Sequence, residues 1–419
     1  MHQTARIISI YAADTSGFCS ALYEYGGMTV IHDASGCNST YTTHDEPRWY
    51  DMDSMMYISG LTESDAVMGN DEKFISDLCS AAMELKPAFI AICASPMPAM
   101  IGIDMEAIAY EVESRTGIPA FNVRTNGMQS YISGAADAFL KLSDRFTEDL
   151  PRDNKIDIDE ESGKKITVNI LGMTPLDFPL GSDVEIREWL RKNGFEVNAC
   201  IGMGTSLDEV KSLGKADVNL VVSSIGRPLA ERLKERFNTP FVVGVPYGEK
   251  YAAKLAEILK KSARAKGLAE EAELQNAAST VRIYDEKTAV VGESVLASSL
   301  AAAISMDLGI GARVIETVGE GDMSQLMVGQ HGDISCDDKD DVQRGDISCD
   351  DEDELERELE KPERIVGDPL FIPICQGKEF VRVPHAAFSG RCFAKESERM
   401  LDISLLHTSF VKQFGEISE

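Results

Sequence analysis

The stretch Asp71-Glu-Lys-Phe-Ile-Ser-Asp-Leu-Cys-Ser-Ala-Ala-Met-Glu-Leu-Lys-Pro-Ala-Phe-Ile-Ala-Ile-Cys93 contains one predicted helix and one predicted strand. The helix, Asp71–Leu85, follows Gly69-Asn70 and ends before Pro87, which cannot continue it. Its apolar face consists of Phe74, Leu78, Ala82 and Leu85. The run Phe89–Cys93 is short and apolar, as expected for a buried strand. A helix that leads directly into a buried strand is typical of a parallel α/β sheet.

The same alternation extends through the chain. Further predicted strands in the first part are Arg6–Tyr11, Met28–His32, Met55–Ile58 and Ala120–Val123, with a second helix at Asp104–Thr116. After a polar, proline-containing stretch, predicted strands follow at Lys165–Gly172, Phe195–Cys200, Val218–Ser223, Phe241–Val245, Thr288–Gly292, Ala312–Val318, Glu363–Asp368 and Glu379–His385. Ser182-x-x-Glu185 and Ser206-x-x-Glu209 match the capping box that opens a helix.

We therefore predict an α/β protein with three Rossmann-like domains, whose mainly parallel sheets are flanked by helices. The predicted domains cover residues 1–150, 164–280 and 281–419. The third domain contains an acidic insert at about 330–360, where 14 acidic residues accompany three basic ones. The insert includes the heptad Gly-Asp-Ile-Ser-Cys-Asp-Asp twice, with Cys336 and Cys349. We expect a solvated loop there, or alternatively a flap that docks a partner.

Net charge, apolar runs and cysteine content exclude several classes of partner and location. A formal net charge of −29 argues against nucleic acid and against anionic membranes as partners. No run of apolar residues is long enough for a membrane span, and the first residues lack the pattern of a secretory leader. We expect a cytoplasmic protein. Nine cysteines in such a protein are more often thiols or metal ligands than disulfides.

Three cysteines, Cys19, Cys37 and Cys93, follow strand-like runs. Because parallel sheets bind ligands beyond the carboxyl ends of their strands, the three thiols can converge on one soft metal or iron–sulfur cluster. Gly36 lets the backbone come close to such a group. A cubane needs four ligands, so the fourth would come from a second chain, a non-cysteine side chain or an exogenous group. Cys79 and Cys200 are expected to be core residues.

Two common nucleotide-binding motifs are missing from the sequence. No Gly-x-x-x-x-Gly-Lys-Ser/Thr phosphate loop occurs, so we do not expect this chain to hydrolyse ATP. Gly202-Met-Gly204 lacks the third glycine of the dinucleotide-binding fingerprint. Iron–sulfur chemistry is therefore favoured over nucleotide chemistry.

Three stretches resemble elements of the nitrogenase component 1 family. His32-Asp-Ala-Ser-Gly-Cys37 is similar to the His-Gly-x-x-Gly-Cys element of that family. Asp65-Ala-Val-Met-Gly-Asn-Asp-Glu-Lys-Phe74 is similar to Val-Phe-Gly-Gly-Glu-x-x-Leu. Cys93-Ala-Ser-Pro-Met-Pro-Ala-Met-Ile-Gly-Ile-Asp104 resembles the Cys-Pro-x-x-x-Ile-Gly-Asp-Asp region. Their order and spacing agree with the family over about residues 15–135, and weaker similarity continues into the third predicted domain.

The resemblance implies three α/β domains and a dimeric or larger assembly, with either a homodimer or a paralogous component 1 subunit. It also implies an iron–sulfur cluster, 4Fe-4S or larger, shared between subunits and held here by Cys19, Cys37 and Cys93. A separate ATP-dependent iron–sulfur reductase protein would supply the electrons. That partner would carry the phosphate loop that this chain lacks. Such clusters are typical of anaerobic oxidoreductases and electron transfer proteins.

Departures from the family pattern indicate which kind of family member this chain is. Where nitrogenase holds its active-site cofactor by a cysteine, this chain has serine at about position 223, within Val221-Val-Ser-Ser-Ile-Gly226. We therefore do not expect a dinitrogen-reducing subunit. His385 is the nearest candidate for the second cofactor ligand, and we expect the segment from His385 to Arg391 to line a substrate cavity or, equally, to form a hydrogen-bonded turn. Gly127 would let the backbone approach the cluster.

Other residues near these positions carry weaker expectations. Tyr41, His44 and Arg48 follow Cys37 and are expected to be solvated loop residues, with proton supply or anion contact as the alternative. Cys375 and Cys392 flank His385 and are expected to be buried rather than ligands.

Three hypotheses for function remain. The first is a catalytic subunit of a nitrogenase-like two-component reductase that passes low-potential electrons through the cluster to a substrate. The second is a non-catalytic scaffold for metal-cluster assembly. The third is a small-molecule binder without a cluster.

Overall fold

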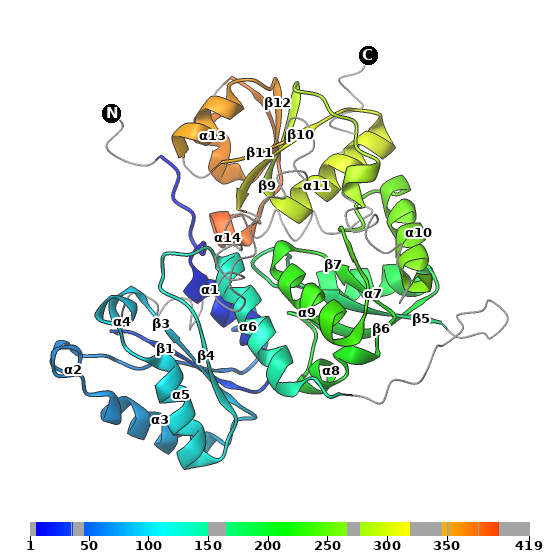
Figure 1. Cartoon of the computed structure of the whole chain (residues 1–419). Helices are drawn as coiled ribbons and strands as arrows, with labels where there is room; N and C mark the ends of the chain where they lie inside the picture. Colours follow the sequence, from blue (N-terminus) through cyan, green and yellow to red (C-terminus); the bar gives the residue numbers. More distant parts are fainter. Residues whose placement is uncertain are drawn as a thin grey trace.

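The computed structural model describes residues 6–34, 36, 46–149, 165–265, 277–318, 346–349, 352–375 and 377–393. Three separate sheets, all parallel, are flanked by helices (Figure 1). The predicted α/β class with mainly parallel sheets is therefore confirmed. No helix in the described part of the chain is both long and apolar enough to cross a membrane.

The first sheet has the strand order β2-β1-β3-β4. Its unit comprises α1 (Asp14–Leu22), β1 (Met28–His32), β2 (Met55–Ile58), α2 (Glu63–Met68), α3 (Asp71–Leu85), β3 (Ile90–Ala94), α4 (Pro96–Ile101), α5 (Met105–Thr116), β4 (Ala120–Val123) and α6 (Tyr131–Phe146). Every residue of β1 and β3 is buried. Apolar side chains on both faces of these central strands explain why helices cover the sheet on each side.

The second sheet has the order β6-β5-β7-β8. Its unit comprises β5 (Ile166–Leu171), α7 (Ser182–Lys192), β6 (Phe195–Ile201), α8 (Leu207–Lys211), β7 (Val218–Val221), α9 (Arg227–Phe237), β8 (Phe241–Val243) and α10 (Lys250–Arg264). The N-cap at Ser206 is confirmed, because its hydroxyl accepts from the Glu209 N–H, whereas the Glu209 carboxylate accepts from the Cys200 N–H and does not complete the box. The capping box at Ser182 is wrong: Gly181 is the N-cap, and the Ser182 hydroxyl donates to the Pro179 carbonyl.

The third sheet has the order β11-β10-β9-β12-β13. Its unit comprises β9 (Thr288–Glu293), α11 (Ser294–Ala303), a π-helical turn at Ile304–Leu308, β10 (Arg313–Val318), β11 (Ile347–Ser348), α13 (Glu352–Leu359), β12 (Arg364–Gly367), a 3₁₀ segment at Pro369–Ile374, β13 (Glu379–Arg382) and α14 (Ala386–Ser389). The sequence also predicts a C-terminal helix from about Glu396, and that stretch lies outside the described residues.

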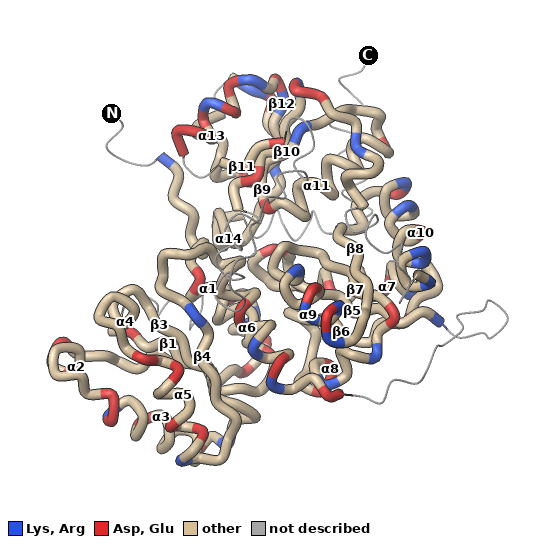
Figure 2. The backbone as a smooth tube through the Cα atoms, in the orientation of Figure 1, with Lys and Arg blue, Asp and Glu red and all other residues tan. Residues whose placement is uncertain are grey.

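The acidic insert is partly folded, which corrects the expectation of a solvated loop for its second half. β11 pairs with β10, and Asp346 accepts from the Val314 N–H and from Arg282. α13 is rich in charged residues (Figure 2) and buries Leu355 and Leu359. Ordered backbone bonds and buried leucines explain why this acidic sequence is structured. The first copy of the heptad lies outside the described residues.

The N-terminal strand prediction is wrong. Residues 6–11 form no strand, and Ile8 and Ile10 are exposed. The N–H groups of Ile10 and Tyr11 donate instead to the carbonyls of Phe388 and Ala387, beside α14. The end of this apolar run thus bonds its backbone N–H groups to the third sheet's unit and not to a neighbouring strand. Cys19 consequently lies within α1 and does not follow a strand.

α1 and α6 cross in very close contact, which places Cys19. A Cβ on Gly17 would lie 1.9 Å from the Tyr131 carbonyl oxygen, and one on Gly134 would lie 1.9 Å from the Asp14 carbonyl oxygen. All nine residues of α1 are buried. Only glycine allows the two backbones to approach so closely.

Gly17→Ala should therefore force α1 away from α6. We expect the free energy of unfolding to fall by roughly 1–3 kcal/mol, the usual cost of overpacking a core. Urea denaturation followed by circular dichroism measures this loss. Ser114→Ala, on the exposed surface of α5, is the control and should change stability by no more than about 0.5 kcal/mol. Equal stability of Gly17→Ala and the control would contradict the close crossing.

Candidate functional site

Cys93 lies in β3, between β1 and β4 in the middle of the first sheet. Its register partners are Ile31 and Val123, and its side chain is fully buried. Burial raises the pKa of the Cys93 thiol well above its usual range, and ionisation of Cys19 would raise it further. A hydrogen bond with Thr125 acts in the opposite direction. Cys93 and Cys19 belong to one apolar core, in which α1 packs against β3.

Cys19 reaches the same region from α1. It is fully buried and belongs to the same apolar core as Cys93. Burial, followed by the charge of Glu46, raises the pKa of the Cys19 thiol well above its usual range. The structure therefore brings together two of the three predicted ligands, from a helix and a strand. Cys37 and its neighbours Tyr41 and His44 lie outside the described residues.

The chemistry of this thiol pair fits an iron–sulfur cluster. Both cysteines are free, and thiolates are the ligands that such clusters use. Metal binding displaces the thiol protons, so burial does not prevent ligation. Among the described residues no three His, Cys, Asp or Glu side chains are grouped to hold a metal ion. Cys19 and Cys93 would be two of the predicted ligands, and the third, Cys37, lies outside the described residues.

Both predicted glycines have unusual backbone conformations. Gly36 is exposed with φ of +146°, a value that residues with side chains rarely adopt. Gly127 has φ of +71°, and a Cβ there would lie 2.4 Å from Pro96 Cγ. The Gly127 N–H donates to the buried carboxylate of Asp14 at 2.8 Å. Gly127 thus lets its loop pack against the start of α4, immediately after Cys93.

Arg48 is buried, so the expectation of a solvated loop residue is wrong for it. Its guanidinium donates to Glu24 and Glu46 and to the carbonyls of Ser20 and Gly202. These carboxylates hold the pKa of Arg48 above its usual value despite burial. Gly202 follows β6, so Arg48 joins the segment after Cys37 to the second sheet. Complete pairing explains how a cation is accommodated there.

The predicted residues His385 and Arg391 are not brought together. His385 is 8% exposed, while Arg391 is exposed beyond α14. His385 Nε2 lies 3.1 Å from Asp177 Oδ1. The backbone N–H of His385 donates to Asp368 at 2.6 Å, as expected for a hydrogen-bonded turn. Cys375 is buried as expected, whereas Cys392 is exposed, which corrects the prediction for it.

Asp177 is the centre of a buried polar cluster where the three sheets' units meet. The Tyr131 hydroxyl, from α6, donates to Asp177 Oδ1 at 2.6 Å. The Ser223 hydroxyl, after β7, donates to the other carboxylate oxygen. His385 approaches from the third sheet's unit. We call these four residues the junction cluster.

Glu293 lies beside the junction cluster at the end of β9 and is fully buried. Its carboxylate accepts from the N–H groups of Ser224 and Leu296 at 3.0 and 2.9 Å, and from the Ser224 hydroxyl. Sequence reasoning missed both Asp177 and Glu293. The available signal was an acidic residue at or just beyond the carboxyl end of a predicted strand, where α/β proteins place their sites.

The junction cluster does not fit a nitrogenase-type cofactor. Ser223, at the position where the resemblance predicts the cofactor cysteine, is fully buried and already bonded to Asp177. The same carboxylate contacts His385. Oxygen donors committed to one another are poor ligands for a soft iron site.

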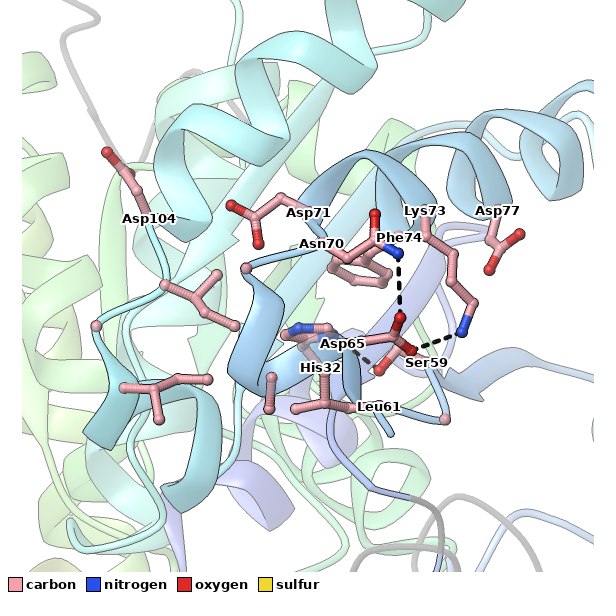
Figure 3. Close-up of a pocket in the computed structure, with 16 residues that line it drawn as sticks. His32, Ser59, Leu61, Asp65, Asn70, Asp71, Lys73, Phe74, Asp77 and Asp104 are labelled. Carbon is pink, nitrogen blue, oxygen red and sulfur yellow. Dashed lines mark hydrogen bonds and ion pairs between the residues drawn. The ribbon is translucent and has the colours of Figure 1, made fainter. Parts of the chain in front are cut away.

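A pocket of about 300 Å³ opens beside α2, α3 and α4 (Figure 3). All three family-like stretches contribute to it, through His32, Asp65–Phe74 and Ile101–Asp104. His32 stacks on Phe74 with ring centroids 4.1 Å apart, and its Nδ1 lies 2.8 Å from the Ser59 hydroxyl. Burial lowers the pKa of His32 to about 4, so the imidazole is neutral near pH 7.

Known proteins with similar sequences cover about half of this chain. The nitrogenase iron-molybdenum cofactor biosynthesis protein NifE of Clostridium pasteurianum is 26% identical over 235 residues, which cover 52% of this chain and 48% of that protein. The nitrogenase molybdenum-iron protein alpha chain of the same organism is 27% identical over 45% of this chain and 33% of its own length. One subunit of the light-independent protochlorophyllide reductase of Leptolyngbya boryana is 28% identical over 48% of this chain and 39% of its own length. The chain thus matches half or less of the length of these relatives.

Solved structures agree on the fold. The structure of nitrogenase Cp1 at pH 6.5 aligns with a TM-score of 0.59 at 14% identity, covering 100% of this chain and 96% of that chain. The same protein at pH 5 gives a TM-score of 0.60 at 17% identity, covering 98% of this chain and 91% of that chain. The family model described as nitrogenase component 1 type oxidoreductase matches residues 25–361, most of the sequence. The chain belongs to the nitrogenase component 1 type oxidoreductase family.

Proposed function

We propose that this chain is a subunit of a nitrogenase-like two-component reductase, with three α/β domains near 1–150, 164–280 and 281–419. The observation that carries the proposal is the pair of thiols, Cys19 and Cys93, buried in one apolar core in a chain of this family. With Cys37 they would hold an iron–sulfur cluster, 4Fe-4S or larger, shared with a second copy or a paralogous subunit. When bound, the cluster would supply one-electron transfer at low potential.

The protein's own residues would tune that site. Cys19 is held by the close crossing of α1 and α6, and Cys93 by β3. Full burial keeps water from both thiols, and burial is one of the factors that set the potential of a cluster. Arg48 fixes the segment that follows Cys37 by its bonds to Glu24 and Glu46. Gly36 and Gly127 would let the backbone lie close to the cluster.

An ATP-dependent iron–sulfur reductase protein would deliver the electrons at the face that carries the pocket. α4 begins three residues after Cys93, and α2 lies across the same pocket. Both helices expose large apolar side chains: Val67, Met68, Met100 and Ile101. Exposed methionines and aliphatic residues around a pocket are typical of a protein-binding surface.

On the substrate side, we propose that His385 acts as a proton donor or acceptor and that Arg391 contacts an anionic group. The backbone N–H of His385 is held by Asp368, and its Nε2 lies 3.1 Å from Asp177 Oδ1. Imidazole is the side chain best suited to proton transfer near neutral pH. The cytoplasm, where reductants are available, is the expected location.

A scaffold for metal-cluster assembly is the second candidate. Two observations favour it: the junction cluster fills the region where a nitrogenase-type cofactor would bind, and one of the similar proteins is a cofactor biosynthesis protein. The test is anaerobic incubation with reductase, MgATP and dithionite. Continued substrate consumption supports the reductase, whereas transfer of iron and sulfide to an apo-acceptor in a stoichiometric amount without turnover supports the scaffold. A colourless, iron-free protein would contradict both.

Replacing a ligand should remove the cluster and leave the fold. We expect Cys93→Ala, Cys19→Ala and Cys37→Ala each to lose most bound iron after anaerobic purification, because a cluster does not persist when a ligand is missing. Iron analysis and electron paramagnetic resonance measure the loss. Cys200→Ala is the matched control, since Cys200 is equally buried but lies in β6 of the second sheet. Full iron retention in Cys93→Ala would remove that residue from the site.

Charges on the apolar face should weaken reductase binding. We expect Met68→Asp and Met100→Asp to lower affinity at least tenfold, a loss of about 1.4 kcal/mol, while iron content stays unchanged. Surface plasmon resonance with the reductase measures the change. Val184→Asp, at an exposed site on α7, is the control. If both methionine variants bind as well as the control, the reductase docks elsewhere.

His385→Gln tests the substrate side. It should lower turnover by roughly 10²-fold, the usual contribution of a positioned acid or base, without loss of iron. Arg391→Gln should raise the substrate concentration needed for half-maximal rate and leave the maximal rate nearly unchanged. Normal turnover of the His385 variant would exclude a catalytic role for that residue.

A further inference from the structure

Two buried carboxylates meet at the three-sheet junction without a strongly basic partner. Asp177 is 5% exposed and Glu293 is 0% exposed. They come from different sheets, since Asp177 follows β5 and Glu293 ends β9. Within the described residues, neither carboxylate pairs with a lysine or an arginine. The two carboxylates accept from adjacent residues, since Ser223 donates to Asp177 and Ser224 donates to Glu293, so both contact the same short segment after β7.

Two carboxylates in such a place cannot both be ionised at low cost. Burial removes the water that stabilises each charge, and the second charge is repelled by the first. Pairs of this kind bind one proton between them at a pH well above the usual range of carboxyl groups. Burial and then the charge of Asp177 raise the pKa of Glu293 to about 7, although its hydrogen bonds to Ser224 and Leu296 oppose the shift.

The two carboxylates have different neighbours. Asp177 accepts from the hydroxyls of Tyr131 and Ser223, and its Oδ1 lies 3.1 Å from His385 Nε2. Glu293 has no such imidazole contact among the described residues. The Ser224 hydroxyl, which donates to Glu293, also lies 2.7 Å from the Ser294 hydroxyl and shares a hydrogen bond with it.

The remaining titratable groups that face the pair stay neutral or lie beyond it. Burial raises the pKa of Tyr131 and of Tyr247, both of which are also affected by Asp177 and Glu293, so neither phenol ionises near neutral pH. Asp368 lies behind His385, where it accepts the His385 backbone N–H and the Ser389 hydroxyl. Glu293 is therefore the carboxyl group of this set whose pKa is raised by burial and by a second carboxylate, and His385 is the imidazole that lies beside Asp177.

We propose that the junction is a binding site for one proton, held by Glu293 beside Asp177, and that this proton links closure of the three units to pH. The first unit supplies Tyr131, the second supplies Asp177 and the third supplies Glu293. Separation of the units admits water to both carboxylates and releases the proton. Closure is consequently favoured below neutral pH and weakened above it. The site needs neither a cluster nor a reductase.

Infrared spectroscopy of protein containing ¹³C-carboxyl glutamate tests the site directly. Between pH 5 and 9 we expect one protonated glutamate carboxyl band that disappears with a midpoint near 7 and is missing from Glu293→Gln. Glu235→Gln, which alters an exposed carboxylate on α9, should leave the band unchanged. No glutamate band titrating near neutral pH, or the same band in Glu293→Gln, would overturn the proposal.

Two variants should move that midpoint in opposite directions. Asp177→Asn removes the neighbouring charge and should shift the midpoint to lower pH. Ser224→Ala removes a donor that stabilises the ionised carboxylate and should shift it to higher pH. If Asp177→Asn does not fold, Ser224→Ala alone still decides the matter. A midpoint that either folded variant leaves unchanged contradicts the assignment.

Stability against pH gives an independent measure. Because the pKa of Glu293 is raised in the folded state, its favourable contribution is complete below about pH 4.5 and is lost as pH rises to about 7. The urea midpoint of Glu293→Gln, compared with that of the unaltered protein, should therefore rise across this window and level off above it. Hydrogen exchange at the Ser224 and Leu296 amides, corrected for intrinsic rates, should quicken above pH 7 only in the unaltered protein. A pH-independent difference in stability would rule out the link between the proton and closure.

Discussion

The carboxylate of Asp177 is the interaction on which the arrangement of the three sheets depends. It accepts a hydrogen bond from the hydroxyl of Tyr131 in the first unit and another from the hydroxyl of Ser223 in the second unit. It also lies beside His385 of the third unit. Each of these groups is buried, so none has water as an alternative partner. Unpaired buried polar groups cost free energy, and the cluster therefore favours one mutual placement of the units. Apolar packing alone would allow small displacements of one unit relative to another, whereas the hydrogen bonds to Asp177 require a defined geometry.

The same helix connects this junction to the thiols. Tyr131, which bonds to Asp177, is the first residue of α6, and its carbonyl is the atom that Gly17 of α1 approaches. Cys19 lies two residues further along α1. The junction and the thiols are thus joined through one tightly packed helix crossing. Interiors packed at native density can transmit strain between such sites.

Periodicity predicted the sheet elements well, because burial on both faces leaves a clear pattern. The helix Asp71–Leu85 and the strand Met55–Ile58 have the predicted bounds. Arg6–Tyr11 has the same apolar character but no neighbouring strand, so its backbone bonds to α14 instead. Pairing partners are a tertiary property that local pattern does not contain.

The candidate site was predictable only where one residue type carries the chemistry: Cys19 and Cys93 stood out because thiols are rare and the family-like stretches surround them. Arg48, Asp177 and Glu293 belong to common residue types whose default place is the surface, and their burial depends on distant partners that spacing along the sequence does not reveal.

The two sites differ in the ligands that they select, and this difference bears on what the chain does. Thiols suit soft metals such as the iron of an iron–sulfur cluster. At the junction, hydroxyl, carboxylate and imidazole groups replace the thiol that the family pattern would require, and they bind one another. Carboxylates crowded in this way bind protons. On the proposed function, electrons would arrive at the thiols and a proton would be held at the junction, so the two components that a reductive addition of hydrogen requires would bind at separate sites.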